Sequence, residues 1–167
     1  MTEKNPEKYW LLKSEPITYS IDQLERDRLS RWEGVRNYQA RNFMTEQMQV
    51  DDLAIFYHSN TKPPGAAGIC RISQPAIPDF TAWDLASDYF DPASMPDKPR
   101  WYMVEVEFVR KFPRLVSLSE MREDPKLEGM LLLQKGQRLS IQPLTFEYFQ
   151  QICNLSEMDL KTNRLVK

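Results

Sequence analysis

Apolar positions along the chain fall into short segments, each of which predicts one strand or helix. Residues 9–13 (YWLLK) and 53–59 (LAIFYHS) are apolar on both faces, as strands inside a closed or covered sheet are. A further strand is expected in residues 66–73 (AAGICRIS), because the Pro-Pro-Gly before it stops any earlier element. Residues 138–143 (RLSIQP) predict another short strand.

The clearest pattern lies in residues 101–112 (WYMVEVEFVRKF), where side chains alternate with a period of two. This predicts a long strand with one solvated face. We expect one face to hold Tyr102, Val104, Val106 and Phe108, and the other to hold Met103, Glu105 and Glu107.

Helix starts are marked by capping boxes, in which a Ser is followed three residues later by Glu or Gln. Ser20 with Gln23 forms one, and SLSE at 117–120 forms another. Residues 145–155 (TFEYFQQICNL) predict an amphipathic closing helix. About five strands interrupted by such helices favour a small mixed barrel wrapped by helices. We treat residues 1–167 as a single domain that ends, from Ser156, in a frayed tail, residues 156–167.

Composition narrows the class of protein. The hydrophobic share of 41% and the charged share of 28% are ordinary for a globular domain. No apolar run approaches the length of a membrane helix, and the polar opening MTEKNPEK does not resemble a signal peptide. We therefore expect a cytoplasmic protein that makes no membrane contact. Cys70 and Cys153 form no metal-binding pattern and are expected to be buried thiols.

Charge is distributed unevenly along a chain whose formal net charge is −2. Residues 79–97 hold five Asp and no Lys or Arg, whereas residues 31–42 hold three Arg and one Glu. Whole-chain charge therefore leaves room for a local basic site. We expect the Asp-rich stretch to turn away from that site or to act as its lid. The basic surface itself is expected to comprise Lys13, Arg36, Arg41 and Lys62.

Two enzymatic interpretations have little support in the sequence. A thiol nucleophile would pair Cys70 with His58, the single histidine, but no spacing requires that they meet. A magnesium-dependent nuclease would need a lysine two positions after a strand carboxylate, and here Glu105 is followed at that distance by Glu107. The carboxylates for such a site would be Asp79, Asp84, Asp88 and Asp91. We expect no enzyme activity, no metal and no cofactor.

The segment 32–42 (WEGVRNYQARN) gathers aromatic, guanidinium and carboxamide groups. Flat aromatic and Arg faces suit stacking, and an Asn or Gln can pair with the edge of a base. The alternative is that Trp32 and Tyr38 are core aromatics and the Arg residues a solvated face. Clustering around Gly34, which permits close backbone approach, favours a pocket for a planar ligand.

Six motifs in order resemble those of the EVE domain family. They are YWLLKSEP, WEGVRNYQARNFM, DLAIFYHSN, PPGAAGICRI, PRWYMVEVEFVRKFPRLVSLSEM and LLLQKGQRLSIQPLT. The resemblance runs from about residue 8 to residue 153. The resemblance implies an α+β, PUA-like fold with its core at about residues 8–155: a small bent β-barrel with peripheral short helices. It also implies a non-enzymatic pocket for a modified nucleobase, chiefly modified cytosine in DNA, with RNA as the other possible partner.

The same resemblance implies the residues of the pocket. Related YTH domains have Gly-Val-Trp-Ser where this chain has Gly-Val-Arg-Asn, so a cage aromatic must come from Trp32 or Tyr38 instead. The ligand-binding residues implied are Lys13, Ser14, Trp32, Gly34, Val35, Arg36, Asn37, Tyr38, Arg41, Tyr57, His58, Ser59 and Gln142. Two alternatives stay open for the same pocket: a sensor of a free nucleotide or other planar small molecule, and a protein-interaction module.

Overall fold

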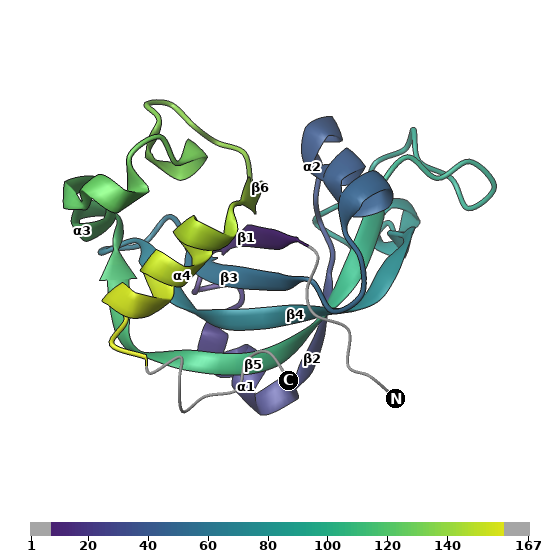
Figure 1. Cartoon of the computed structure of the whole chain (residues 1–167). Coiled ribbons are helices and arrows are strands. Elements are labelled where there is room, and N and C mark those ends of the chain that lie inside the picture. The colour runs from purple at the N-terminus through teal and green to yellow at the C-terminus, as the bar shows by residue number, and fades with distance from the viewer. Residues whose placement is uncertain (1–7, 159–167) are drawn as a thin grey trace.

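A mixed six-stranded sheet runs through the centre of the protein (Figure 1), whose computed structural model describes residues 8–158. Its strands are β1 (Tyr9–Ser14), β2 (Leu29–Trp32), β3 (Leu53–His58), β4 (Gly65–Pro78), β5 (Tyr102–Ser117) and β6 (Ile141–Leu144). Their order is β2-β5-β4-β3-β1-β6, with β1 and β3 parallel and the other pairs antiparallel. The α+β class is confirmed. Within the described residues β2 and β6 are the two edges, so the sheet stays open.

Short helices cover this sheet. They are α1 (Ile21–Asp27), α2 (Tyr38–Asn42) with the π-helical turn η1 (Phe43–Gln47), η2 (Phe80–Trp83), α3 (Leu118–Glu123), η3 (Pro125–Leu127), η4 (Leu131–Leu133) and α4 (Phe146–Leu155). Figure 1 shows α3 and α4 near one end of the long strands β4 and β5, and α2 near the other. Helices therefore lie near both ends of these long strands, and the helices at the two ends come from different parts of the chain.

The capping boxes act as the sequence predicts at α1 and in part at α3. Ser20 Oγ accepts from Gln23 N at 3.2 Å, and Gln23 Oε1 accepts from Ser20 N at 2.7 Å. Ser117 Oγ likewise accepts from Glu120 N. The Glu120 carboxylate instead pairs with Arg114 at 2.6 Å, so only half of the second box forms.

Two apolar cores lie on opposite faces of the sheet. Alternate β3 residues point to different cores: Phe56 packs with Trp10 and Trp32, whereas Ile55 packs against α3 and α4. This confirms the prediction of a strand apolar on both faces in a covered sheet. The start of the expected tail also packs, because Ser156 and Met158 are buried. Residues 159–167 of that tail lie outside the described residues.

The strands differ from the sequence prediction in two respects. β2 was not predicted, because its four residues (LSRW) are too few and too polar for a periodic signal. Met103 was placed on the solvated face of the long strand but is fully buried. Register shifts in the β4–β5 pairing between Ile72 and Ile77 interrupt the alternation there.

This burial predicts unequal costs for two neighbouring substitutions. Met103→Ala should lower the free energy of unfolding by about 2–5 kcal/mol, because it leaves a cavity. Glu105→Ala removes a partly exposed side chain whose carboxylate accepts one hydrogen bond, from Ser73. Its cost should stay near 1 kcal/mol. Urea denaturation measures both, and equal costs would contradict the assignment of Met103 to the core.

Candidate functional site

A first cavity of about 550 Å³ opens where the ends of β1 and β2 meet the loop that leads into α2. Its size falls in the range of small-molecule sites, about 300–1,000 Å³. Three aromatic rings reach it from separate segments: Tyr19, Trp32 and Tyr89. The remaining lining residues are Lys13, Ser14, Glu15, Thr18, Ser30, Arg31, Glu33, Gly34, Val35, Arg36 and Ser140.

The cavity wall is held by the carboxylate of Asp79, which is fully buried. Asp79 Oδ2 accepts from Gly34 N and from Arg36 Nη1, both at 2.9 Å, and Oδ1 accepts from Thr81 N. We call these four residues the Asp79 cluster. Burial alone would raise the pKa of Asp79, but the hydrogen bonds from Thr81, Gly34 and Arg36 outweigh it and lower the pKa. The cluster joins the loop after β2 to the Asp-rich stretch 79–97.

Every hydrogen-bond donor of the Arg36 guanidinium is used within the protein. A guanidinium has five N–H donors, and those of Arg36 make five bonds, to Tyr89 O twice, to Val35 O, to Asp79 and to Thr81 Oγ1. No donor is left for a phosphate. The expected basic surface therefore does not form as predicted: Arg36 is neutralised by Asp79, and Lys62 is not among the residues that line this cavity.

Gly34 and Tyr89 fit together closely at the cavity edge. Gly34 has φ = +82°, and a Cβ added there would lie 2.6 Å from Cζ of Tyr89. The ring of Tyr89 in turn lies beside the guanidinium of Arg36, at 5.6 Å. The Asp-rich stretch is therefore not turned away from the site, as one of our two expectations had it, but supplies one of its aromatic rings.

Two ionisable groups at the cavity are shifted by burial. Desolvation lowers the pKa of Lys13 and raises that of Glu33; for Glu33 the nearby charge of Asp79 adds to the rise. Within residues 8–158 the Glu33 carboxylate accepts no hydrogen bond from another residue. The cavity thus offers an acceptor close to several flat faces.

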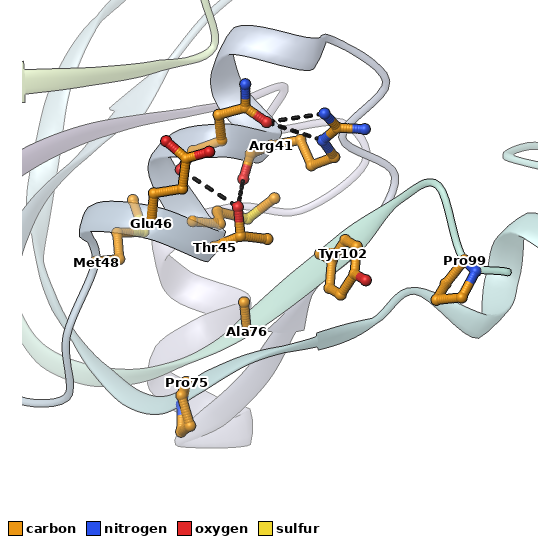
Figure 2. A pocket seen from close by; sticks show the side chains of 10 residues that line it. Arg41, Thr45, Glu46, Met48, Pro75, Ala76, Pro99 and Tyr102 are labelled. Carbon is orange, nitrogen blue, oxygen red and sulfur yellow. Dashed lines mark hydrogen bonds between the residues drawn. The ribbon is translucent and has the colours of Figure 1, made fainter.

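The next residues of the same segment leave the first cavity. Asn37 caps α2, with Oδ1 accepting from Ala40 N at 2.9 Å. Tyr38 is 52% exposed and stacks on Trp101 at 4.9 Å. Arg41 lines a second cavity of about 520 Å³, in which α2 and η1 face Ala76 of β4 and Tyr102 of β5 (Figure 2).

The chain matches a known domain family over most of its length. The EVE domain model matches residues 8–155. The chain belongs to the EVE domain family. Mouse and human thymocyte nuclear protein 1 are 41% and 40% identical to it, in alignments that cover 93% of this chain and 76% and 77% of theirs. The resemblance seen in the sequence is thereby confirmed.

Solved structures agree with this assignment. Human THYN1 in complex with DNA containing 5-methylcytosine has a TM-score of 0.84 at 40% identity, over 92% of this chain and 99% of that one. A hypothetical protein from Leishmania major reaches 0.86 at 44% identity, over 90% and 94%.

These relatives overturn one expectation about the EVE domain. The mouse and human relatives are named thymocyte nuclear protein 1, whereas the sequence led us to expect a cytoplasmic protein. The prediction of a cytoplasmic protein was wrong because the features behind it do not separate cytoplasm from nucleus. In residues 8–158 no helix combines the length and apolarity needed to cross a membrane.

Four other residues implied by the resemblance are not among those that line the first cavity. Tyr57 is buried in the core beneath α3 and α4, and Gln142 Nε2 donates to Leu139 O. His58 Nε2 accepts from Ile21 N at the start of α1, and Ser59 N donates to Ser14 O. In this EVE domain the four residues contact other residues of the chain, by hydrogen bonds or by packing in the core.

The cysteines and carboxylates considered above for catalysis are poorly suited to it. The prediction of two buried thiols is confirmed, and burial raises the pKa of Cys70 and of Cys153 to about 12. Such thiols stay protonated at neutral pH, so a thiolate nucleophile has no chemical basis here. Across residues 8–158 no group of three His, Cys, Asp or Glu side chains could hold a metal ion.

Several lining residues escaped sequence reasoning. Tyr89 lies within the Asp-rich stretch 79–97, which was noted only for its charge, and Tyr19 follows a strand without any motif of its own. Glu33 was inside the selected segment but was counted only as a charge. Only its position beside Trp32 could have marked Glu33 as a lining residue. No sequence pattern marked Tyr89 or Tyr19 in this way.

The Asp79 cluster predicts a specific loss of stability in acid. Because the folded-state pKa of Asp79 is depressed, its contribution is present above the ordinary carboxyl pKa of about 3.9. It is lost as pH falls through the folded value. Asp79→Asn should cost about 3 kcal/mol at neutral pH, since Arg36 loses its partner, and should flatten the acid limb of the stability profile. Urea denaturation at several pH values measures this.

The exposed Asp88 supplies the control for that experiment. Asp88→Asn should leave both stability and its pH profile close to those of the wild type. An Asp79→Asn protein with an unchanged acid limb would show that other carboxylates govern acid unfolding.

Contact between Gly34 and Tyr89 predicts a difference between two glycine substitutions. Gly34→Ala and Gly136→Ala both place a Cβ at positive φ, but an added Cβ at Gly136 meets nothing within 4 Å. Both should lower the free energy of unfolding by about 1–2 kcal/mol because of the left-handed backbone. Gly34→Ala should lower it by about 1–3 kcal/mol more because of overpacking against Tyr89, and Tyr89→Ala should remove that excess. Thermal melts of the single and double variants test this coupling.

Proposed function

We propose that this EVE domain binds DNA carrying a modified cytosine, and that the extruded base occupies the first cavity without being chemically changed. The observation that carries the proposal is the structure of human THYN1, 40% identical over most of this chain, in complex with DNA containing 5-methylcytosine. The first cavity supports it by combining aromatic rings with a polar acceptor in a space of suitable size.

Stacking supplies part of the energy for extruding a base. Taking a base out of the helix costs a few kcal/mol, and each base stacked on an aromatic side chain returns about 1–3 kcal/mol. Trp32 and Tyr89 offer such rings at the cavity. Trp32 is only 8% exposed and also packs edge-on against Phe56, so it supports the core as well as the site. Hydrogen bonds to the base edge must supply the rest.

Glu33 is the residue to which we assign the reading of cytosine. Cytosine presents an N4 amino donor, and a carboxylate accepts from it. Thymine has the same 5-methyl group but carries an O4 acceptor there, which a carboxylate repels. Hydrogen bonding at the edge of the base, and not the shape of the base, therefore discriminates between 5-methylcytosine and thymine.

The 5-methyl group itself contributes less. Val35 lines the cavity and supplies apolar surface for a methyl group. Burying one carbon is worth about 0.8 kcal/mol, which is roughly a fourfold gain in affinity. We therefore assign most of the selectivity to the cytosine edge and only a modest preference to the methylation.

A carboxylate-to-amide exchange tests this assignment. Wild-type protein should bind a short single-stranded oligonucleotide with one 5-methylcytosine about 10- to 100-fold more tightly than the same strand with thymine there. Glu33→Gln should bind both within about threefold, because an amide can present a donor or an acceptor. Glu33→Ala should lose affinity for the 5-methylcytosine strand. Tryptophan fluorescence and polarisation titrations measure these affinities.

Two results would argue against the proposal. If Glu33→Gln keeps the full preference for 5-methylcytosine, another group reads the base. If the wild type binds free nucleotides but none of the oligonucleotides, a sensor of planar small molecules describes the cavity better. Incubation of labelled DNA with protein and magnesium should leave the strand intact, as a binding module requires.

A further inference from the structure

We infer that Tyr38 and Arg41 form a second DNA contact, which holds the nucleotide next to the extruded base on the same strand. Both belong to the segment 32–42 but lie outside the lining of the first cavity. The inference rests on the proposed function, because it needs the strand to enter the first cavity. It assigns a role to a surface that the base pocket leaves unused.

Arg41 has hydrogen-bonding capacity to spare, unlike Arg36. Of its five donors, three are used within the described residues: Nε and Nη2 donate to Asn42 Oδ1, and Nη1 donates to Arg100 O. These three bonds fix the plane of the guanidinium. Two donors remain, at the tip of the group, on a side chain that is partly exposed. A positioned guanidinium with free donors at its tip suits a phosphate.

Tyr38 supplies a flat face beside that charge. Its ring stacks on Trp101 at 4.9 Å, and Cζ of Arg41 lies 4.7 Å from Tyr38 and 6.0 Å from Trp101. The three distances form a compact triangle, so Arg41 does not lie on the far side of Tyr38 from Trp101. The outer face of a ring that is 52% exposed is thus available to a base.

A continuous row of stacked groups links this surface to the first cavity. Tyr89 and Arg36 line that cavity, and the guanidinium of Arg36 lies 5.6 Å from Tyr89 and 5.6 Å from Trp101. Trp101 then carries Tyr38, which Arg41 flanks. Trp101 is buried, so the rings of this row that the strand can reach are Tyr89 at the first cavity and Tyr38 beyond it. Alternating aromatic and cationic groups are the usual surface for single-stranded nucleic acid.

The second cavity limits where the phosphate can lie. Arg41 and Glu46 both line it, from α2 and η1, as Figure 2 shows. The Glu46 carboxylate repels a phosphate, so we place the phosphate at the tip of Arg41 and not within the cavity. The neighbouring base then lies over Tyr38.

The test compares a nucleoside with a strand. Free 5-methyl-2′-deoxycytidine reports the first cavity alone, and a single-stranded oligonucleotide containing 5-methylcytosine reports both contacts. Arg41→Ala should bind the nucleoside as the wild type does. For the oligonucleotide, the slope of log affinity against log salt should become less steep by about 0.7, the value for one lost phosphate contact on a single strand.

Tyr38→Ala should give a different signature. Its nucleoside affinity and salt slope should match the wild type, but oligonucleotide affinity should fall roughly 5- to 100-fold with the lost stacking. Arg26→Ala, an exposed change on α1, is the control for loss of charge alone and should leave the slope unchanged. Arg41→Gln repeats the Arg41 test if Arg41→Ala melts below the wild type.

The outcomes separate the two claims. A wild-type salt slope in both Arg41 variants overturns the phosphate contact, and a Tyr38→Ala protein with wild-type affinity overturns the stacking. Loss of nucleoside binding in a stable Arg41 variant also overturns the inference, since Arg41 would then serve the first cavity. Failure of the wild type to prefer 5-methylcytosine over thymine instead counts against the proposed function.

Discussion

The buried carboxylate of Asp79 is the interaction on which the candidate site depends. Its position just after β4 lets it cap η2 while accepting from Gly34 and Arg36, more than 40 residues earlier in the chain. A buried carboxylate is tolerated only when it is paired and hydrogen-bonded, and here two of its partners, Gly34 and Arg36, also line the cavity. The same interaction therefore neutralises a charge and sets the position of the loop that lines the cavity.

In the proposed function, this arrangement lets a chain with net charge −2 contact DNA. Of the arginines in residues 31–42, Arg36 is neutralised by Asp79 and has no donor left, so it contributes rigidity and a flat face. Arg41 forms no ion pair within residues 8–158, and there only three of its five donors are used. Donor counting thus separates two residues that look alike in sequence. A few well-placed contacts allow the base edge, and not the sugar-phosphate backbone, to set specificity.

Much of the fold could be predicted because local rules decide it. The apolar strands β1 and β3, the capping box of α1 and the closing helix α4 follow from periodicity and capping residues that neighbours in sequence supply. β2 and the burial of Met103 could not be predicted in this way. The first depends on pairing with β5, and the second on bulges in the β4–β5 ladder, which are properties of the partner strand.

The site divides along the same line. Segment 32–42 supplies lining residues to both cavities, but its residues separate at Asn37, which caps α2 and turns the chain away from the first cavity. Tyr89 approaches from more than 50 residues later because Gly34 has no side chain to exclude it. No local pattern in residues 79–97 announces that contact, since it arises from the absence of a Cβ elsewhere. The first cavity is therefore a product of long-range complementarity: a glycine makes room, a distant tyrosine fills it, and a buried aspartate holds the two segments together.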